Sequence, residues 1–90
     1  MSKAAIEGLT KSMALELAAK NITVNAVALG YFNKGLINEV SKEIQDIVIS
    51  KTPLKRLGNV NEYSSLISYL LSESSSFITG QVLHVNGGIY

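Results

Sequence analysis

The segment that most restricts the fold of this chain is the apolar run at residues 22–29. Its apolar side chains stand at both odd and even positions, which is typical of a strand covered on both faces within a parallel sheet. Gly30 ends the run. Such a strand needs neighbouring strands, because a long apolar edge left open is a site of aggregation.

The first predicted helix lies before that strand, at residues 2–19, and Asn21 ends it. Apolar side chains recur there at the spacing of one helical face. They are Ile6, Leu9, Met13 and Leu17. This stripe is predicted to belong to the core or to a subunit interface.

A second helix is predicted from about Leu36 or Ser41 to Ser50, and Pro53 closes it. Four side chains are expected to point inward. They are Val40, Ile44, Ile47 and Val48.

The third predicted helix begins after Asn59, and Glu62 stands at the capping-box position three residues later. Its apolar face contains Tyr63, Leu66, Ile67, Leu70 and Leu71. A short strand at residues 81–85 follows a polar turn and ends at a turn containing Gly87 and Gly88. The order helix, strand, helix, helix, strand predicts an α/β fold with a doubly wound parallel sheet. Two strands leave such a sheet incomplete as a domain.

Composition excludes several classes of protein. Hydrophobic residues make up 47% of the 90 residues, which argues against disorder. The net charge of +1 gives no reason to expect nucleic acid or an anionic membrane as a partner. Without cysteine there are no disulfides or thiolate metal sites, and no metal site is predicted. Neither a signal peptide nor a membrane span is recognisable, so a cytoplasmic location is the default expectation.

Five segments carry a resemblance to a known family. They lie at residues 2–12, 22–28, 53–58, 77–81 and 85–88. In this order and spacing they resemble the C-terminal part of the short-chain dehydrogenases/reductases, and most closely the 3-oxoacyl-[acyl-carrier-protein] reductase branch. The resemblance spans nearly the whole chain.

The resemblance implies that residues 1–90 form the C-terminal segment of one Rossmann-like domain, with the dinucleotide-binding N-terminal half absent. It also implies an NAD(P)-dependent oxidoreductase that interconverts a carbonyl and a secondary alcohol. The cofactor would be NADP(H) or NAD(H), and the substrate a small or acyl-carrier-bound carbonyl compound, as in fatty acid biosynthesis. Such enzymes form homo-oligomers.

Lys3 matches the lysine of the family's Tyr-x-x-x-Lys motif, whose tyrosine would stand two places before Met1. In the family this lysine holds the nicotinamide ribose and favours the tyrosinate, so the resemblance gives Lys3 a catalytic and a cofactor-binding role. A unit positive charge about 4 Å away, at an effective dielectric near 20, contributes roughly 4 kcal/mol. That equals roughly three pK units. The alternative is a solvated lysine at a helix start.

Cofactor-binding roles are also implied for Gly30, Tyr31, Phe32 and Lys34, which follow the first strand. The family lays backbone against the nicotinamide carboxamide there, usually through Pro-Gly and then a threonine. This chain has Leu29 in place of the proline and Lys34 in place of the threonine.

Other interpretations stay open for single residues. Gly30 can serve only to end a strand, and Lys34 only as a solvated charge. His84 is expected to be structural. Gly87 and Gly88 are expected to form a turn rather than a phosphate loop, since no helix follows them.

Taken alone, the chain is expected to be inactive, since the tyrosine, serine, asparagine and glycine-rich turn of the family are missing. An alternative from another class is a non-enzymatic remnant or assembly partner of a full-length reductase. A dehydrogenase of sugars, polyols or another small alcohol remains open within the enzymes.

Overall fold

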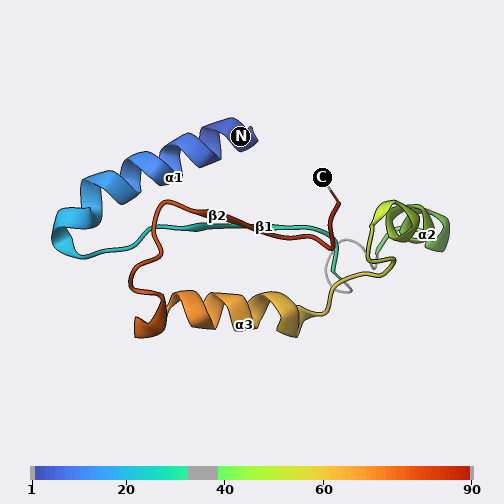
Figure 1. Ribbon diagram of the computed structural model, residues 1–90. Helices are drawn as coiled ribbons and strands as arrows, with labels where there is room; N and C mark the ends of the chain where they lie inside the picture. The colour runs from blue at the N-terminus through green and yellow to red at the C-terminus, as the bar shows by residue number, and fades with distance from the viewer. Residues whose placement is uncertain (1, 33–38, 90) are drawn as a thin grey trace. The chain divides into compact units, whose positions relative to one another are not determined.

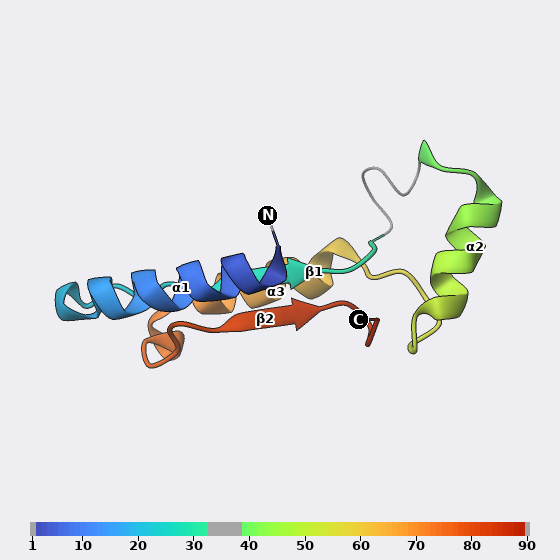
Figure 2. The ribbon, with the colours of Figure 1, turned by 90° about the horizontal axis from the view of Figure 1, so that it is seen from above.

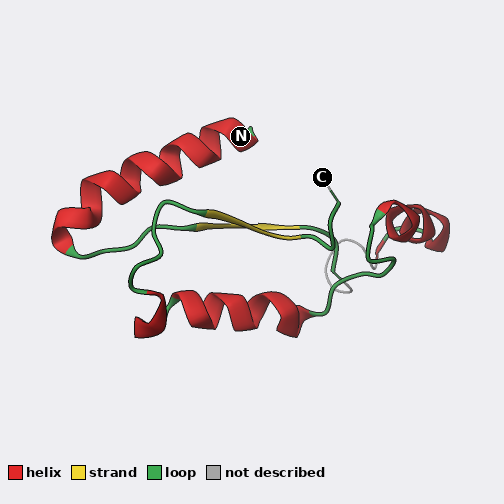
Figure 3. Ribbon diagram, in the orientation of Figure 1, coloured by secondary structure: helices red, strands yellow, loops and turns green. Residues whose placement is uncertain are grey.

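The computed structural model describes residues 2–32 and 39–89. Figures 1 and 3 show a helix, a strand, two further helices and a final strand, which confirms the predicted order. The elements are α1 (Lys3–Leu17), η1 (Ala18–Lys20), β1 (Ala26–Leu29), α2 (Lys42–Lys51), α3 (Val60–Leu70), η3 (Glu73–Ser75) and β2 (Val82–Val85). The alternative helix start at Leu36 and the predicted cofactor residue Lys34 lie outside the described residues.

The two strands form one parallel pair, as the α/β prediction requires. The Ala26 N–H donates to the Gln81 carbonyl at 2.9 Å, and the Gly30 N–H donates to the Val85 carbonyl at the same distance. The predicted strand at residues 22–29 was too long, because β1 begins only at Ala26. The chain before it is held by one backbone hydrogen bond, from the Gly80 N–H to the Val24 carbonyl at 2.7 Å, and by side-chain hydrogen bonds.

By its internal contacts the chain divides into two compact units. The first contains Met1–Ala28 and Ile67–Leu83, and the second contains Leu29–Leu66 and His84–Tyr90. In the first unit, α1 and the end of α3 lie on opposite faces of the strand pair (Figures 1 and 2). This arrangement is that of a doubly wound sheet.

Asn25 joins the two segments that lead into the strands of the first unit. Its Nδ2 donates to the Ile78 carbonyl at 3.0 Å, and its Oδ1 accepts from the Gln81 N–H at 3.1 Å. Beside it, the Thr79 hydroxyl oxygen accepts from the Val24 N–H at 3.0 Å. These bonds satisfy backbone groups that the shortened strand leaves unpaired, and they fix where the two strands start to pair.

Replacing Asn25 with alanine should therefore destabilise the chain by about 0.5–1.5 kcal/mol, because the half-buried Ile78 carbonyl and the exposed Gln81 N–H lose their partner. Urea denaturation followed by circular dichroism measures the change. Asn61→Ala is a matched control at an exposed position on α3, and it should change stability by less than about 0.5 kcal/mol. Equal effects of the two substitutions would show that the Asn25 bonds contribute nothing.

Few apolar side chains are buried. Among the described residues, Ala14 is the only hydrophobic residue classed as buried, with 4% of its surface exposed. In the predicted α1 stripe, Leu17 is half-buried, whereas Ile6, Leu9 and Met13 are exposed. The described chain thus leaves these three side chains uncovered, and their assignment to the core or to a subunit interface stays a prediction.

The second helix begins at the later of its two predicted starts. Ser41 is the N-cap of α2, and its hydroxyl accepts from the Ile44 N–H at 3.3 Å. Two of the inward assignments were wrong, because Ile44 and Ile47 are exposed, while Val40 and Val48 are half-buried. On the predicted face of the third helix, Ile67 of α3 and Leu71, which directly follows α3, are likewise exposed, whereas the other predicted apolar positions are half-buried.

Candidate functional site

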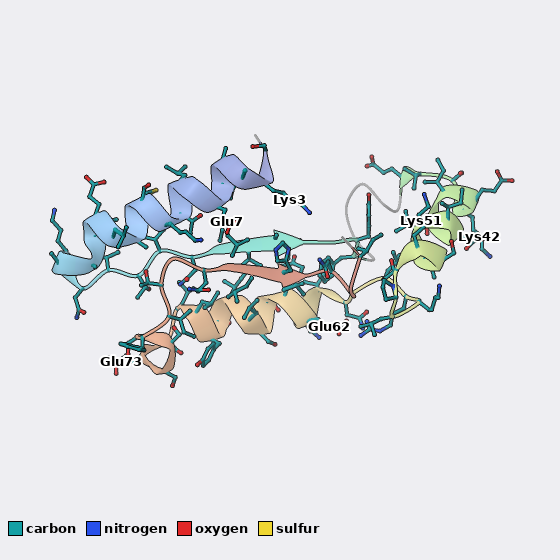
Figure 4. All side chains as sticks on the ribbon, turned by 45° about the horizontal axis from the view of Figure 1, so that its top comes forward. Lys3, Glu7, Lys42, Lys51, Glu62 and Glu73 are labelled. Carbon is teal, nitrogen blue, oxygen red and sulfur yellow. The ribbon has the colours of Figure 1, made fainter. Side chains whose placement is uncertain are left out.

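Lys3 is the first residue of α1 and is exposed; Figure 4 shows its side chain projecting from the start of the helix. Ser2 caps the helix by accepting from the Ala5 N–H at 3.1 Å. Serine is among the preferred N-cap residues, so the sequence itself fixes where the helix starts and where Lys3 stands on it. Lys3 belongs to the first unit, whereas the predicted cofactor residues Gly30, Tyr31 and Phe32 belong to the second.

Gly30 stands where two backbones approach closely. Its N–H donates to the Val85 carbonyl, and a Cβ added to it would lie 2.7 Å from the Asn86 Cα. Real side chains do not tolerate this separation, and the obstacle is backbone that cannot rotate away. A packing requirement therefore accounts for the glycine, beside any contact with a cofactor.

Phe32 is held by packing on two sides. Its ring stands edge-on to the ring of Tyr63, with centroids 4.9 Å apart and planes at 80°. On the other side, a Cβ added to Gly58 would lie 2.5 Å from the Phe32 ring. Phe32 and Gly58 also form a parallel backbone bridge. Contacts with Tyr63 and Gly58 thus hold the Phe32 side chain, so that only its backbone can face a cofactor.

The strongest polar cluster in the second unit joins Arg56, Asn59 and Glu62. The Arg56 guanidinium donates to both carboxylate oxygens of Glu62, at 2.6 and 2.8 Å. Glu62 Oε1 also accepts from the Asn59 N–H at 2.8 Å, which confirms the predicted capping box of α3. The hydrogen bonds from Arg56 are the main cause that lowers the pKa of Glu62 to about 2, and Glu62 in turn raises the pKa of Arg56.

The ion pair between Arg56 and Glu62 makes the folding stability of the chain depend on pH in the acidic range. The pKa of Glu62 falls from 4.5 to about 2 on folding, so its contribution is present above about pH 4.5 and is lost as the pH falls toward 2. Unfolding midpoints of the native chain and of Glu62→Gln should therefore differ at neutral pH and converge near pH 2. A difference that stays constant over this range would contradict the assignment.

The end of the chain packs on the segment that follows α2. The Leu54 N–H donates to the Gly87 carbonyl at 3.1 Å, and Asn86 Oδ1 accepts from the Gly88 N–H at 2.9 Å. Gly88 has a φ of 92° and lies against Pro53. Gly87 and Gly88 thus form a turn, as predicted, and no phosphate loop is needed to explain them.

A cavity of about 460 Å³ lies within the second unit. Its apolar wall consists of Tyr31, Phe32, Pro53, Leu54 and Val85. The same cavity is lined by the polar side chains of Arg56, Glu62, His84 and Asn86. It therefore joins two predicted cofactor neighbours to the segment around Pro53 and to the turn at the chain end.

Sequence reasoning missed the part of Leu54, Arg56 and His84 in this lining. The sequence singles out residues 53–58 only by their resemblance to the family, and His84 only as a structural residue of a strand. The sequence offers one indication of this lining: residues 53–58 and 85–88 both belong to the family resemblance. The structure brings these two segments into direct contact.

Over residues 2–32 and 39–89, no group of three His, Cys, Asp or Glu side chains is placed to hold a metal ion. Within the same ranges, no helix has both the length and the apolar character needed to cross a bilayer.

Comparison with known proteins agrees with the resemblance. A family model described as enoyl-(acyl carrier protein) reductase matches residues 1–90. The 3-oxoacyl-[acyl-carrier-protein] reductase of Buchnera aphidicola is 46% identical over 89 residues, which are 99% of this chain and 36% of that protein. Nodulation protein G of Azospirillum brasilense is 40% identical over 98% of the chain.

The fold has a close counterpart among solved structures. The crystal structure of a 3-oxoacyl-[acyl-carrier protein] reductase from Brucella melitensis matches 98% of this chain with a TM-score of 0.91 and 40% identity, and the match covers 33% of that protein. The chain thus spans about a third of the length of these relatives. Because the family model matches it from end to end, the chain belongs to the short-chain dehydrogenase/reductase family.

Proposed function

We propose that residues 1–90 are the C-terminal segment of an NAD(P)-dependent oxidoreductase domain that interconverts a 3-oxoacyl thioester and its 3-hydroxy product. The observation that supports this most strongly is the match of 98% of the chain, at 40% identity, to the Brucella melitensis reductase. A nicotinamide cofactor supplies or accepts the hydride when it is bound.

In this proposal Lys3 holds the cofactor ribose and favours the ionised form of the family's catalytic tyrosine. Its exposed position at the start of α1 is compatible with reaching a ligand. Gly30, Tyr31 and Phe32 contribute backbone contacts. The residues fit that task, because the Phe32 ring is packed on Gly58 and Tyr63 and does not block its own backbone.

The 90 residues contain no Tyr-x-x-x-Lys sequence. On its own, the chain is therefore expected to catalyse no reduction with NADPH or NADH. The assembly-partner alternative differs in its prediction, because such a chain would bind a full-length reductase without adding a reaction of its own.

The experiment uses a composite chain, in which residues of this chain replace the 89 matched residues of the Buchnera aphidicola reductase. Oxidation of NADPH with acetoacetyl thioester is measured in the composite and in the 90-residue chain. Turnover by the composite, together with no turnover by the 90-residue chain, supports the proposal. Reduction of NADP+ or NAD+ by a sugar or polyol, without oxidation of NADPH by the thioester, would favour the other enzymatic alternative.

A further inference from the structure

The ion pair between Arg56 and Glu62 holds the backbone on both sides of Gly58. Besides donating to both carboxylate oxygens of Glu62, the guanidinium donates through Nη1 to the Leu57 carbonyl at 3.2 Å. On the other side of Gly58, the Asn59 N–H donates to Glu62 Oε1 at 2.8 Å. Gly58 is therefore fixed between two residues that the ion pair binds.

The geometry of this pair sets it apart from an ordinary surface ion pair. The side chains of Arg56 and Glu62 are 50% and 40% exposed. Exposed ion pairs usually contribute little, but a bidentate arginine–carboxylate pair within a larger network is an exception. Arginine is needed for this arrangement, because lysine presents a point charge and cannot donate to two oxygens in parallel. The pair therefore fixes the position of the backbone that it binds.

Gly58 in turn holds the backbone of Tyr31 and Phe32. The Gly58 N–H donates to the Tyr31 carbonyl at 3.0 Å, and Gly58 forms a parallel bridge with Phe32. The Tyr31 carbonyl and the Phe32 N–H belong to one planar trans peptide, so they point in opposite directions. Binding of the carbonyl to Gly58 therefore directs the Phe32 N–H away from Gly58. All of these residues belong to the second unit.

We infer that Arg56 and Glu62 are positioning residues, which hold the backbone of Tyr31 and Phe32 in place for the nicotinamide end of the cofactor. This role depends on the proposed function, which brings a nicotinamide cofactor to that backbone, whereas the hydrogen bonds that lead from Arg56 to Tyr31 come from the structure alone. Neither charged side chain needs to touch the cofactor. Loss of the pair should weaken the binding of the nicotinamide end and leave the binding of the adenosine end unchanged.

Calorimetric titration of the composite chain distinguishes this role from a general effect on folding. The probes are NADPH and phospho-ADP-ribose, which is NADPH without its nicotinamide. Glu62→Gln keeps a side chain that caps a helix at this position but removes the charge that binds Arg56. Arg56→Lys keeps the charge but loses the parallel hydrogen bonds. Each variant should bind NADPH about threefold to tenfold more weakly, the range of one ordinary hydrogen bond. Binding of phospho-ADP-ribose should change by less than about twofold.

Steady-state kinetics should divide in the same way. In both variants KM for NADPH should rise by the same factor as Kd, and KM for acetoacetyl thioester should stay within about twofold. Combining Arg56→Lys with Glu62→Gln should add little to the loss of either variant, because the two side chains act as one unit. Circular dichroism establishes that the variants fold.

Glu7→Gln is the matched control. Glu7 forms an exposed ion pair with Lys11 at 3.3 Å on α1, in the first unit. Removing this charge should leave the affinities for both probes within about twofold of the unaltered composite.

Equal weakening of NADPH and phospho-ADP-ribose, unchanged NADPH affinity in both variants, or additive losses in the double variant would overturn the inference. A composite that binds NADPH, loses affinity in both variants as expected and yet forms no 3-hydroxy product would leave the positioning role standing and refute the proposed function. Formation of that product, with an NADPH affinity that neither variant changes, would do the reverse.

Discussion

Replacing Lys3 with alanine in the composite chain is expected to lower kcat by at least about a hundredfold, the lower end of what a positioned acid–base group contributes. The ammonium group favours the ionised tyrosine, and its removal returns the pKa of that tyrosine toward its ordinary value near 10. In the direction of thioester reduction the protonated tyrosine is the acid, so the basic limb of the pH–rate profile should move to higher pH. A change in KM alone would indicate that Lys3 only binds the cofactor.

Lys11→Ala is the matched control for this experiment. Lys11 is an exposed lysine of the same helix, and its Nζ lies 3.3 Å from the Glu7 carboxylate. An exposed pair of this kind contributes little to stability, so the control should retain the activity of the unaltered composite. Equal losses in both variants would mean that α1 as a whole, and not the charge at residue 3, supports the reaction.

The largest expected effect on stability comes from Gly30→Ala. The new Cβ would lie 2.7 Å from the Asn86 Cα and 2.8 Å from its Cβ. One of the two segments must move, and this movement strains the hydrogen bond from the Gly30 N–H to the Val85 carbonyl. Overpacking of this kind costs about 1–3 kcal/mol, which urea denaturation measures.

Gly8→Ala is the matched substitution with the opposite expected sign. Gly8 lies within α1, and an added Cβ would have nothing within 4 Å. Alanine is favoured over glycine in a helix by about 1 kcal/mol, so this variant should be more stable than the native chain. Destabilisation by both substitutions, or by neither, would contradict the role assigned to the contact between Gly30 and Asn86.

Features fixed by short-range chemistry were predictable from the sequence. Ser41 was recognised as one of two possible helix starts, and Asn59 with Glu62 was recognised as a capping box. Asn21 ends the first helical segment in the left-handed region, with a φ of 61°, which asparagine tolerates better than most residues. Each of these signals acts within three or four residues.

Features fixed by distant partners were not predictable. β1 starts at Ala26 because Asn25 bonds to Ile78 and Gln81, more than 50 residues away in sequence. The wall of the cavity likewise depends on Leu54 meeting Gly87, a pairing that neither segment encodes alone. Apolar periodicity placed Ile44 and Ile47 inward, but a periodic pattern cannot tell whether a covering partner lies within the described chain.

The exposed apolar side chains fit a segment that belongs to a larger domain. Phe77 is fully exposed, at 101% of its reference surface, and the α1 stripe is exposed at three of its four positions. The curated relatives carry roughly two thirds of their length outside the match. We propose that this remaining length supplies the missing cover, as the expected domain organisation requires.

The most direct test of the central claim is the rate of NADPH oxidation by the composite chain with acetoacetyl thioester, followed by identification of the product. Turnover with formation of the 3-hydroxyacyl thioester is expected, and so is loss of that turnover in Lys3→Ala. A folded composite that binds NADPH yet forms no 3-hydroxy product, or one whose rate is unaffected by Lys3→Ala, would contradict the central claim.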